Sequence, residues 1–157
     1  MRDLEASARH LLDSFYYLSL ATVDDDGTPR VSPLYFTHHR YSDLYWVSSP
    51  AARHSLNIAR DPRTMAVVFD SRVPVGEAEA VYLTGPAEIV PDDELADRCP
   101  VAFDGRGGAT VLTPDDLRGD AMLRLYVLVA HTSEVLVRGS HPTLGTGRDR
   151  RIEISLG

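Results

Sequence analysis

Several residue types are missing or scarce in this chain. All 16 basic residues are arginine, and the 157 residues contain neither lysine nor glutamine. We attribute this to the coding bias of a GC-rich genome and draw no functional conclusion from it. The single cysteine, Cys99, has no partner for an internal disulfide and no second thiol for a metal site, so the chain fits a reducing compartment. Its neighbours Arg98 and Pro100 offer no activating environment, and we do not expect Cys99 to be a nucleophile.

A long hydrophobic run and a surplus of basic charge are also missing. No stretch approaches the roughly 20 apolar residues of a membrane span, and residues 1–5 carry acids where a signal peptide carries an apolar run. The 23 acidic and 16 basic residues give a net charge of −7, which disfavours non-specific electrostatic binding to nucleic acid or to an anionic membrane. A local basic pocket for one small phosphate is compatible with this charge. We therefore expect a soluble, cytoplasmic protein with neither a nucleic-acid nor a membrane partner.

The sequence does contain a series of short strand patterns. An apolar content of 43% suffices for one core, and neither an internal repeat nor a long linker divides the chain, so we predict a single domain over residues 1–157. Alternating or branched apolar segments predict strands at 18–23, 29–36, 44–49, 64–70, 80–90, 123–129 and 134–138. Helical spacing of apolar residues and Pro or Gly signals predict helices at 3–15, 51–60, 92–97 and 114–118. The tail 140–157 ends in an alternating piece, 151–156, suited to extend a sheet edge.

Six or seven strands with small helices predict a mainly β fold. We expect an antiparallel, closed or split β-barrel over residues 18–139 rather than a parallel sheet. Pro33 predicts an edge, a bulge or a bend in its strand, and a bulge would leave backbone groups free to meet a ligand. Gly85 and Pro86 predict a kink in the strand 80–90.

The strongest local signal is a strand-to-helix junction between residues 47 and 57. Free N–H groups at the helix start, the helix dipole, hydroxyls and a guanidinium together make a phosphate cradle. The alternative is that Ser49 only caps the helix and that Arg53 is solvated. The candidate residues at this junction are Ser48, Ser49, Arg53, His54 and Asn57.

The chain also carries short motifs in a characteristic order. They are Leu20-Ala21-Thr22-Val23, Asp26-Gly27-Thr28-Pro29-Arg30-Val31-Ser32-Pro33-Leu34, Leu44-Tyr45-Trp46-Val47-Ser48, Arg53-His54-Ser55-Leu56-Asn57-Ile58, Asp61-Pro62-Arg63 and Gly85-Pro86-Ala87. Over about residues 15–90 this order resembles the small FMN-binding split barrels of the pyridoxamine 5'-phosphate oxidase type. The resemblance implies that a cofactor ring lies along Arg30, Val31, Ser32, Pro33 and Leu34, and that the junction residues hold the phosphate.

One position departs from the pattern of these proteins. Many of them carry a lysine three residues before the asparagine, where this chain has His54. A histidine is neutral over much of the physiological pH range, so phosphate binding would be weaker or pH-dependent unless Arg53 or Arg30 supplies a fixed charge.

The resemblance further implies a homodimer with the cofactor site at the subunit interface. Aromatic residues predicted to be exposed are candidates for this interface or for stacking on the cofactor, although each is more often a core residue. They are Tyr35, Tyr45, Trp46 and Tyr82. Arg138 or His141 of the tail would close the pocket of the partner subunit.

These features favour an FMN-dependent oxidoreductase acting on an unidentified small molecule, in which the cofactor performs the hydride chemistry and no general acid or base is required. The alternatives are an F420-dependent reductase, a non-catalytic flavin or haem carrier, and a structural dimer without ligand. The tail after Arg138 lacks the pattern expected of a true vitamin B6 enzyme. No metal site is expected, because the adjacent His38 and His39 would point to opposite faces of a strand and have no third ligand nearby.

Overall fold

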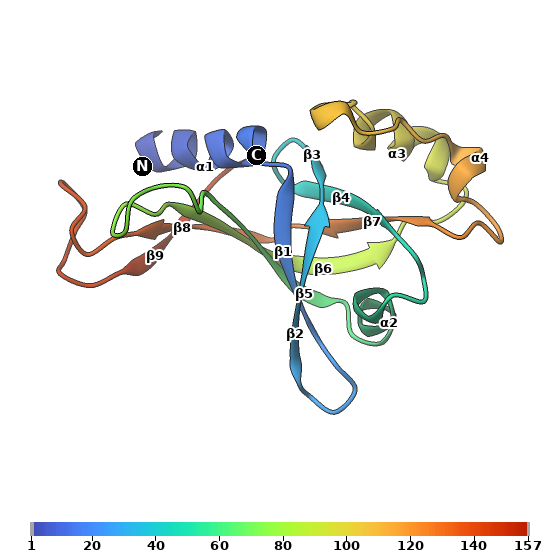
Figure 1. The fold of residues 1–157 in the computed structure, drawn as a ribbon, viewed down its shortest axis with the longest axis horizontal. Helices are drawn as coiled ribbons and strands as arrows, with labels where there is room; N and C mark the ends of the chain where they lie inside the picture. Colours follow the sequence, from blue (N-terminus) through green and yellow to red (C-terminus); the bar gives the residue numbers. More distant parts are fainter. Residues whose placement is uncertain (1, 157) are drawn as a thin grey trace.

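The structure, a computed structural model that describes residues 2–156, consists mainly of antiparallel strands, as the sequence predicts (Figure 1). The strands are β1 (Tyr17–Val23), β2 (Pro29–Tyr35), β3 (Thr37–His39), β4 (Asp43–Ser48), β5 (Arg63–Phe69), β6 (Ala80–Ile89), β7 (Arg124–Val129), β8 (Thr132–Val137) and β9 (Arg150–Ile154). The helices are α1 (Arg2–Ser14), α2 (Arg53–Arg60), α3 (Leu95–Ala102) and α4 (Pro114–Leu117), with a short 3-10 turn, η1, at Arg106–Gly108. The strand order is β2-β1-β5-β6-β7-β4-β3, and β8 pairs with β6 and β9.

β2 and β3 close this sheet into a split barrel. Only Phe36 separates them, so one extended run pairs first with β1 and then with β4. At the join between the two strands, the N–H of Phe36 donates to the carbonyl oxygen of Tyr16 at 3.0 Å. No bulge forms at Pro33, because β1 and β2 keep an unbroken register. β2 pairs only with β1, and the predicted edge position is confirmed: an edge strand tolerates the missing N–H of proline.

β6 is the strand at which the sheet branches. Its residues 81–84 pair with β8 and its residues 87–89 pair with β7, while β5 runs along its other side. Gly85 lies between the two pairings, and a Cβ at this position would stand 1.9 Å from the carbonyl oxygen of Val129. The residues predicted to kink the strand therefore mark its change of partner, and only glycine allows the two backbones to approach so closely.

Side chains fill two cores on opposite faces of β4 and β7. Leu44 and Trp46 join the main core together with the apolar stripe of α1, whereas Tyr45 packs under α3 and α4 in the second core. Tyr45 and Trp46 are only 1% and 2% exposed, so the prediction that they are exposed is wrong and the core alternative holds. Their burial follows from the position of β4, which is covered on both faces.

The remaining differences lie in the connections. The structure has nine strands within residues 2–156 rather than six or seven, since β3 is a separate strand and the tail adds β9 to the edge of β8. The helix predicted at 92–97 is shifted to Leu95–Ala102 and runs through Pro100, because Leu95, Cys99 and Ala102 share one buried face. None of the helices in this part of the chain is long and apolar enough to cross a membrane.

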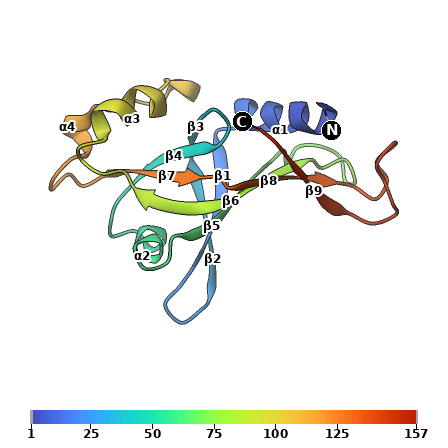
Figure 2. The same ribbon diagram turned by 180° about the vertical axis from the view of Figure 1, so that it is seen from behind.

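The helices are divided between the two sides of the barrel. Figures 1 and 2 show α1 and the α3–α4 segment on one side, and α2 with the turn of the β1–β2 hairpin on the other. The strand-to-helix junction after β4 therefore lies beside the β1–β2 hairpin, where the candidate site is found.

Candidate cofactor site

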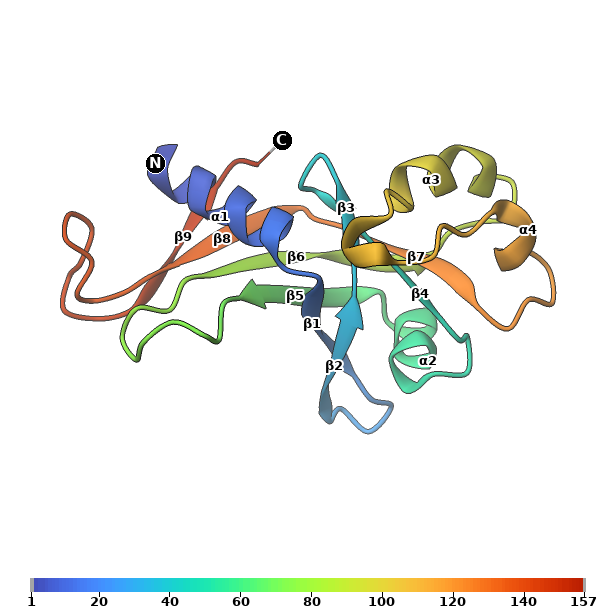
Figure 3. The same cartoon turned by 45° about the horizontal axis from the view of Figure 1, so that its top comes forward.

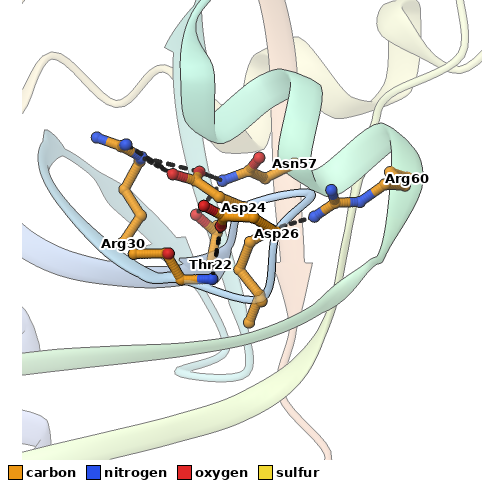
Figure 4. Close-up of polar contacts among 8 residues, drawn as sticks. Thr22, Asp24, Asp26, Arg30, Asn57 and Arg60 are labelled. Carbon is orange, nitrogen blue, oxygen red and sulfur yellow. Dashed lines mark hydrogen bonds and ion pairs between the residues drawn. The ribbon is translucent and has the colours of Figure 1, made fainter.

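A buried carboxylate organises the β1–β2 hairpin. The Arg30 guanidinium donates to Asp24 through Nε at 2.9 and 3.0 Å and through Nη2 at 2.6 Å (Figure 4). Hydrogen bonds from Arg30, and then from Asn57, lower the pKa of the Asp24 carboxyl well below its usual range. Asp24 is therefore ionised at neutral pH and neutralises most of the charge of Arg30.

Asn57 links α2 to the same carboxylate. It is 3% exposed, and its Nδ2 donates to Asp24 Oδ1 at 2.7 Å and to Thr22 Oγ1 at 3.1 Å. Arg60, one turn further along α2, donates to the carbonyl oxygen of Val23. These contacts fix the helix against the hairpin, so the structure shows Asn57 in a positioning contact, and a direct contact of Asn57 with phosphate stays a prediction.

Ser48 and His54 meet across the junction. The Ser48 hydroxyl and His54 Nε2 are 2.8 Å apart, and both side chains are half-buried. Burial lowers the pKa of His54 below its usual value of 6.5. His54 is accordingly neutral at physiological pH, and it does not replace the fixed charge of a lysine.

Arg53 opens α2 and is exposed. Its side chain has no hydrogen bond or ion pair with any residue of the described chain, although its charge contributes a little to the lowered pKa of Asp24. The residue that precedes the helix, Ala52, has no side-chain capping bond. The backbone N–H groups of Arg53, His54 and Ser55 accordingly have no acceptor within residues 2–156. A free guanidinium and free N–H groups at a helix N-terminus are the two elements of an anion site.

Ser49 is not the helix cap. Its Oγ accepts a hydrogen bond from the N–H of Ala51 at 3.2 Å and its carbonyl accepts from Ala52, so it closes the turn that leads into the helix. The capping alternative is therefore wrong for Ser49, since the helix begins at Arg53, two residues later than predicted, and Ala52 directly precedes it.

The ring-binding candidates form the free edge of the barrel. Arg30, Val31 and Pro33 are exposed along β2, and Ser32 and Leu34 are half-buried. The structure thus connects Arg30 to Asn57 through Asp24. It also pairs Ser48 with His54. The other ring-binding candidates lie further along β2 and take no part in these contacts: Val31, Ser32, Pro33 and Leu34.

Sequence reasoning missed Asp24 and Thr22. An acidic run ending in glycine, as at residues 24–27, is typical of a hairpin turn, and Asp26 has that role: its carboxylate accepts from the N–H of Thr28 at 2.9 Å. A signal was present, because the hairpin register pairs Thr22 with Arg30 and so places residue 24 near the arginine.

Other reactive groups do not add to this site. Cys99 is 4% exposed, and burial raises the pKa of its thiol, which disfavours the nucleophilic thiolate. Within residues 2–156, no cluster of three or more His, Cys, Asp or Glu residues has the arrangement of a metal site.

Solved structures with the same fold are described as having different functions. A haem-binding protein from Mycobacterium smegmatis is 22% identical with a TM-score of 0.70, and the match covers 96% of this chain but only 57% of that protein. HutZ, a haem storage protein from Vibrio cholerae, is 23% identical with a TM-score of 0.68, covering 88% of this chain and 96% of HutZ. A protein described as an F420 reductase is 25% identical with a TM-score of 0.58, covering 80% of this chain and 94% of the reductase. These likenesses establish the fold and leave the cofactor undecided.

Sequence comparison identifies the family. A search of curated proteins returned no significant match. The family model described as pyridoxamine 5'-phosphate oxidase matches residues 4–134, which run from α1 into β8 and include every candidate residue. Because the match extends over most of the chain and the strands form the corresponding split barrel, the chain belongs to the pyridoxamine 5'-phosphate oxidase family.

Proposed function

We propose that this protein is an FMN-binding oxidoreductase that transfers hydride or electrons to or from a small molecule. The observation that carries the proposal is the unpaired Arg53 at the start of α2, beside backbone N–H groups without acceptors. The family match and a neighbour described as an F420 reductase support a flavin or a deazaflavin as the ligand.

The residues present fit a terminal phosphate. Arg53 supplies the fixed charge, the N–H groups of the first helical turn supply directed donors, and the hydroxyls of Ser48 and Ser49 lie at the same junction. Arg30 contributes less charge, since Asp24 neutralises it. When bound, FMN supplies the hydride chemistry, while the chain orients the cofactor and excludes water.

The proposal includes a homodimer. The outer face of β1, β2 and β5 carries apolar side chains in adjacent register, among them Tyr17 and Val31, each 66% exposed, and Phe69, 47% exposed. β2 also has a free edge. A contiguous apolar sheet face of this kind is typical of a protein interface, and a second copy of the chain would cover both the face and the edge. We also propose that the protein is cytoplasmic, because a buried free cysteine favours a reducing compartment.

A cofactor titration tests the proposal. Purified protein is titrated with FMN, F420 and haem, and binding is followed by quenching of flavin or deazaflavin fluorescence and by the haem absorption band. We expect saturable binding of FMN with one site per chain. Binding of F420 alone would mean that the cofactor is F420 and not FMN. Binding of haem alone would mean that the protein is a haem carrier, as the neighbours described as haem proteins are. The absence of all three signals would refute the proposal.

A further inference from the structure

A partly open cavity lies between strands of the barrel and the segment that follows α3, and its volume is about 160 Å³. Figure 3 shows this segment passing over β4 and β7. The barrel contributes Leu34, Val47 and Leu125 to the lining, and the covering segment contributes Phe103, Ala109 and Leu112.

The lining of the cavity is uncharged. Within the described part of the chain, no Asp, Glu, Arg or His side chain borders it. Two of its hydroxyl groups are already engaged, since Tyr35 donates to the carbonyl oxygen of Arg106 at 2.7 Å and Thr37 donates to that of Ala102 at 2.5 Å. A charged ligand group would be desolvated here without compensation, and so the cavity selects against it.

The size of the cavity matches one aromatic ring. An apolar cavity of about 150 Å³ engineered in another protein stays dry and binds benzene. At about 160 Å³ and with the same kind of lining, this cavity has room for a single six-membered ring. The phosphate of a pyridoxamine-type substrate has no cation to meet in it.

The cavity shares one residue with the stretch assigned to the cofactor. Leu34, which lines it, is the last residue of the stretch that the resemblance places along the cofactor ring. We propose, resting on the proposed function, that the substrate is an uncharged compound that inserts one aromatic ring into this cavity beside the flavin.

A matched pair of ligands and a matched pair of variants test this inference. Benzamide and benzoate share a ring and differ in charge, and calorimetry measures the binding of each. Ala109→Phe fills the cavity from an extended loop position with φ −65° and ψ 147°. Val111→Phe is the control, since Val111 is 60% exposed in the same loop and does not line the cavity.

We expect benzamide to bind at least about tenfold more tightly than benzoate. We also expect benzamide to perturb the absorption spectrum of bound FMN, and Ala109→Phe, unlike Val111→Phe, to abolish both effects. Equal affinity for the two ligands, or benzamide binding unchanged in Ala109→Phe, would overturn the inference. FMN titration of both variants separates the two proposals: FMN binding without benzamide binding refutes the substrate class alone. Benzamide binding to a chain that never binds FMN refutes the proposed function, and the substrate role falls with it.

Discussion

Arg30 and Asp24 form a two-pronged ion pair across the β1–β2 hairpin, with Nη2 of the arginine 2.6 Å from Oδ2 of the aspartate. Asn57 donates to the other carboxylate oxygen at 2.7 Å, so a strand, a turn and a helix meet at one buried acid. The charge of Arg30 is therefore paired within the protein, whereas the guanidinium of Arg53 has no ion-pair partner among residues 2–156.

Substitutions of Asn57 test this network. Asn57→Ala removes two hydrogen bonds to a buried side chain, and we expect the free energy of unfolding to fall by about 1–3 kcal/mol. Asn57→Asp has nearly the same shape but places a second carboxylate against Asp24, so at neutral pH we expect a larger loss. Urea unfolding at neutral and mildly acidic pH provides the measurement, and the Asn57→Asp defect should shrink in acid as the pair takes up a proton. An Asn57→Asp protein as stable as wild type at neutral pH would contradict the network.

The pH dependence of stability follows from two half-buried histidines. Burial lowers the pKa of His54 and of His38 below the usual value of 6.5. The unfolded chain keeps the higher pKa and takes up protons first, so the free energy of unfolding falls as the pH drops from about 6.5 towards the folded pKa values. Urea unfolding across this range measures the slope, and His54→Gln should reduce it. Stability that rises on acidification in this window would refute the assignment of neutral histidines.

Gly85 tests the branch point of the sheet. A Cβ at Gly85 would stand 1.9 Å from the Val129 carbonyl oxygen, a backbone atom that has little room to move. We expect Gly85→Ala to lower the free energy of unfolding by about 3 kcal/mol. Gly76→Ala is the comparison, because its Cβ meets no atom within 4 Å and only its φ of +86° is unfavourable, at about 1 kcal/mol. Thermal melts that rank the two variants in the opposite order would refute the packing argument.

Val31 tests the proposed dimer. It lies in β2 and is 66% exposed, and a charge introduced there would be buried if a second chain covers this face. We expect sedimentation velocity to show a dimer for wild type and a monomer for Val31→Glu. Val75→Glu makes the same change at a fully exposed residue of the β5–β6 loop, outside the three strands of this face, and should remain dimeric. A monomeric wild type, or a dimer that tolerates Val31→Glu, would contradict the interface.

The sequence predicts those parts of the fold in which burial alternates. β1 and β5 bury every second residue, and this alternation is visible in the residue pattern. β3 escapes prediction because Thr37–His39 is polar and its turn to β4 places Arg40 and Tyr41 at positive φ without a glycine or asparagine to signal it. Tertiary contacts with α1 stabilise that turn: the Tyr41 hydroxyl donates to Asp13 at 3.2 Å, and the Arg9 guanidinium lies 4.6 Å from the centroid of the Tyr41 ring.

For the site, the sequence predicts the strand-to-helix junction but not its internal contacts. The local sequence pattern predicts a helix start near Arg53, and a side chain at a helix start is commonly exposed and unpaired, as Arg53 is. The local pattern does not predict the role of Asp24, because an acid in a turn is usually solvated. Its burial depends on a contact with Asn57, which lies 33 residues further along the chain in α2. Burial of Tyr45 likewise depends on the later segment around α3, and burial of Trp46 depends on the main core on the other face of β4, where it stacks on Tyr126.

The most direct test of the account compares FMN with riboflavin, which lacks the phosphate, in wild type and in Arg53→Ala. Since a charge-assisted contact contributes about 1.5–3 kcal/mol, we predict that the variant binds FMN about tenfold to a hundredfold more weakly and binds riboflavin as wild type does. Arg63→Ala, which removes an exposed arginine paired with Asp61, controls for net charge and should change neither affinity. Equal losses for both ligands, or no loss for FMN, would contradict the assignment of Arg53 to the phosphate.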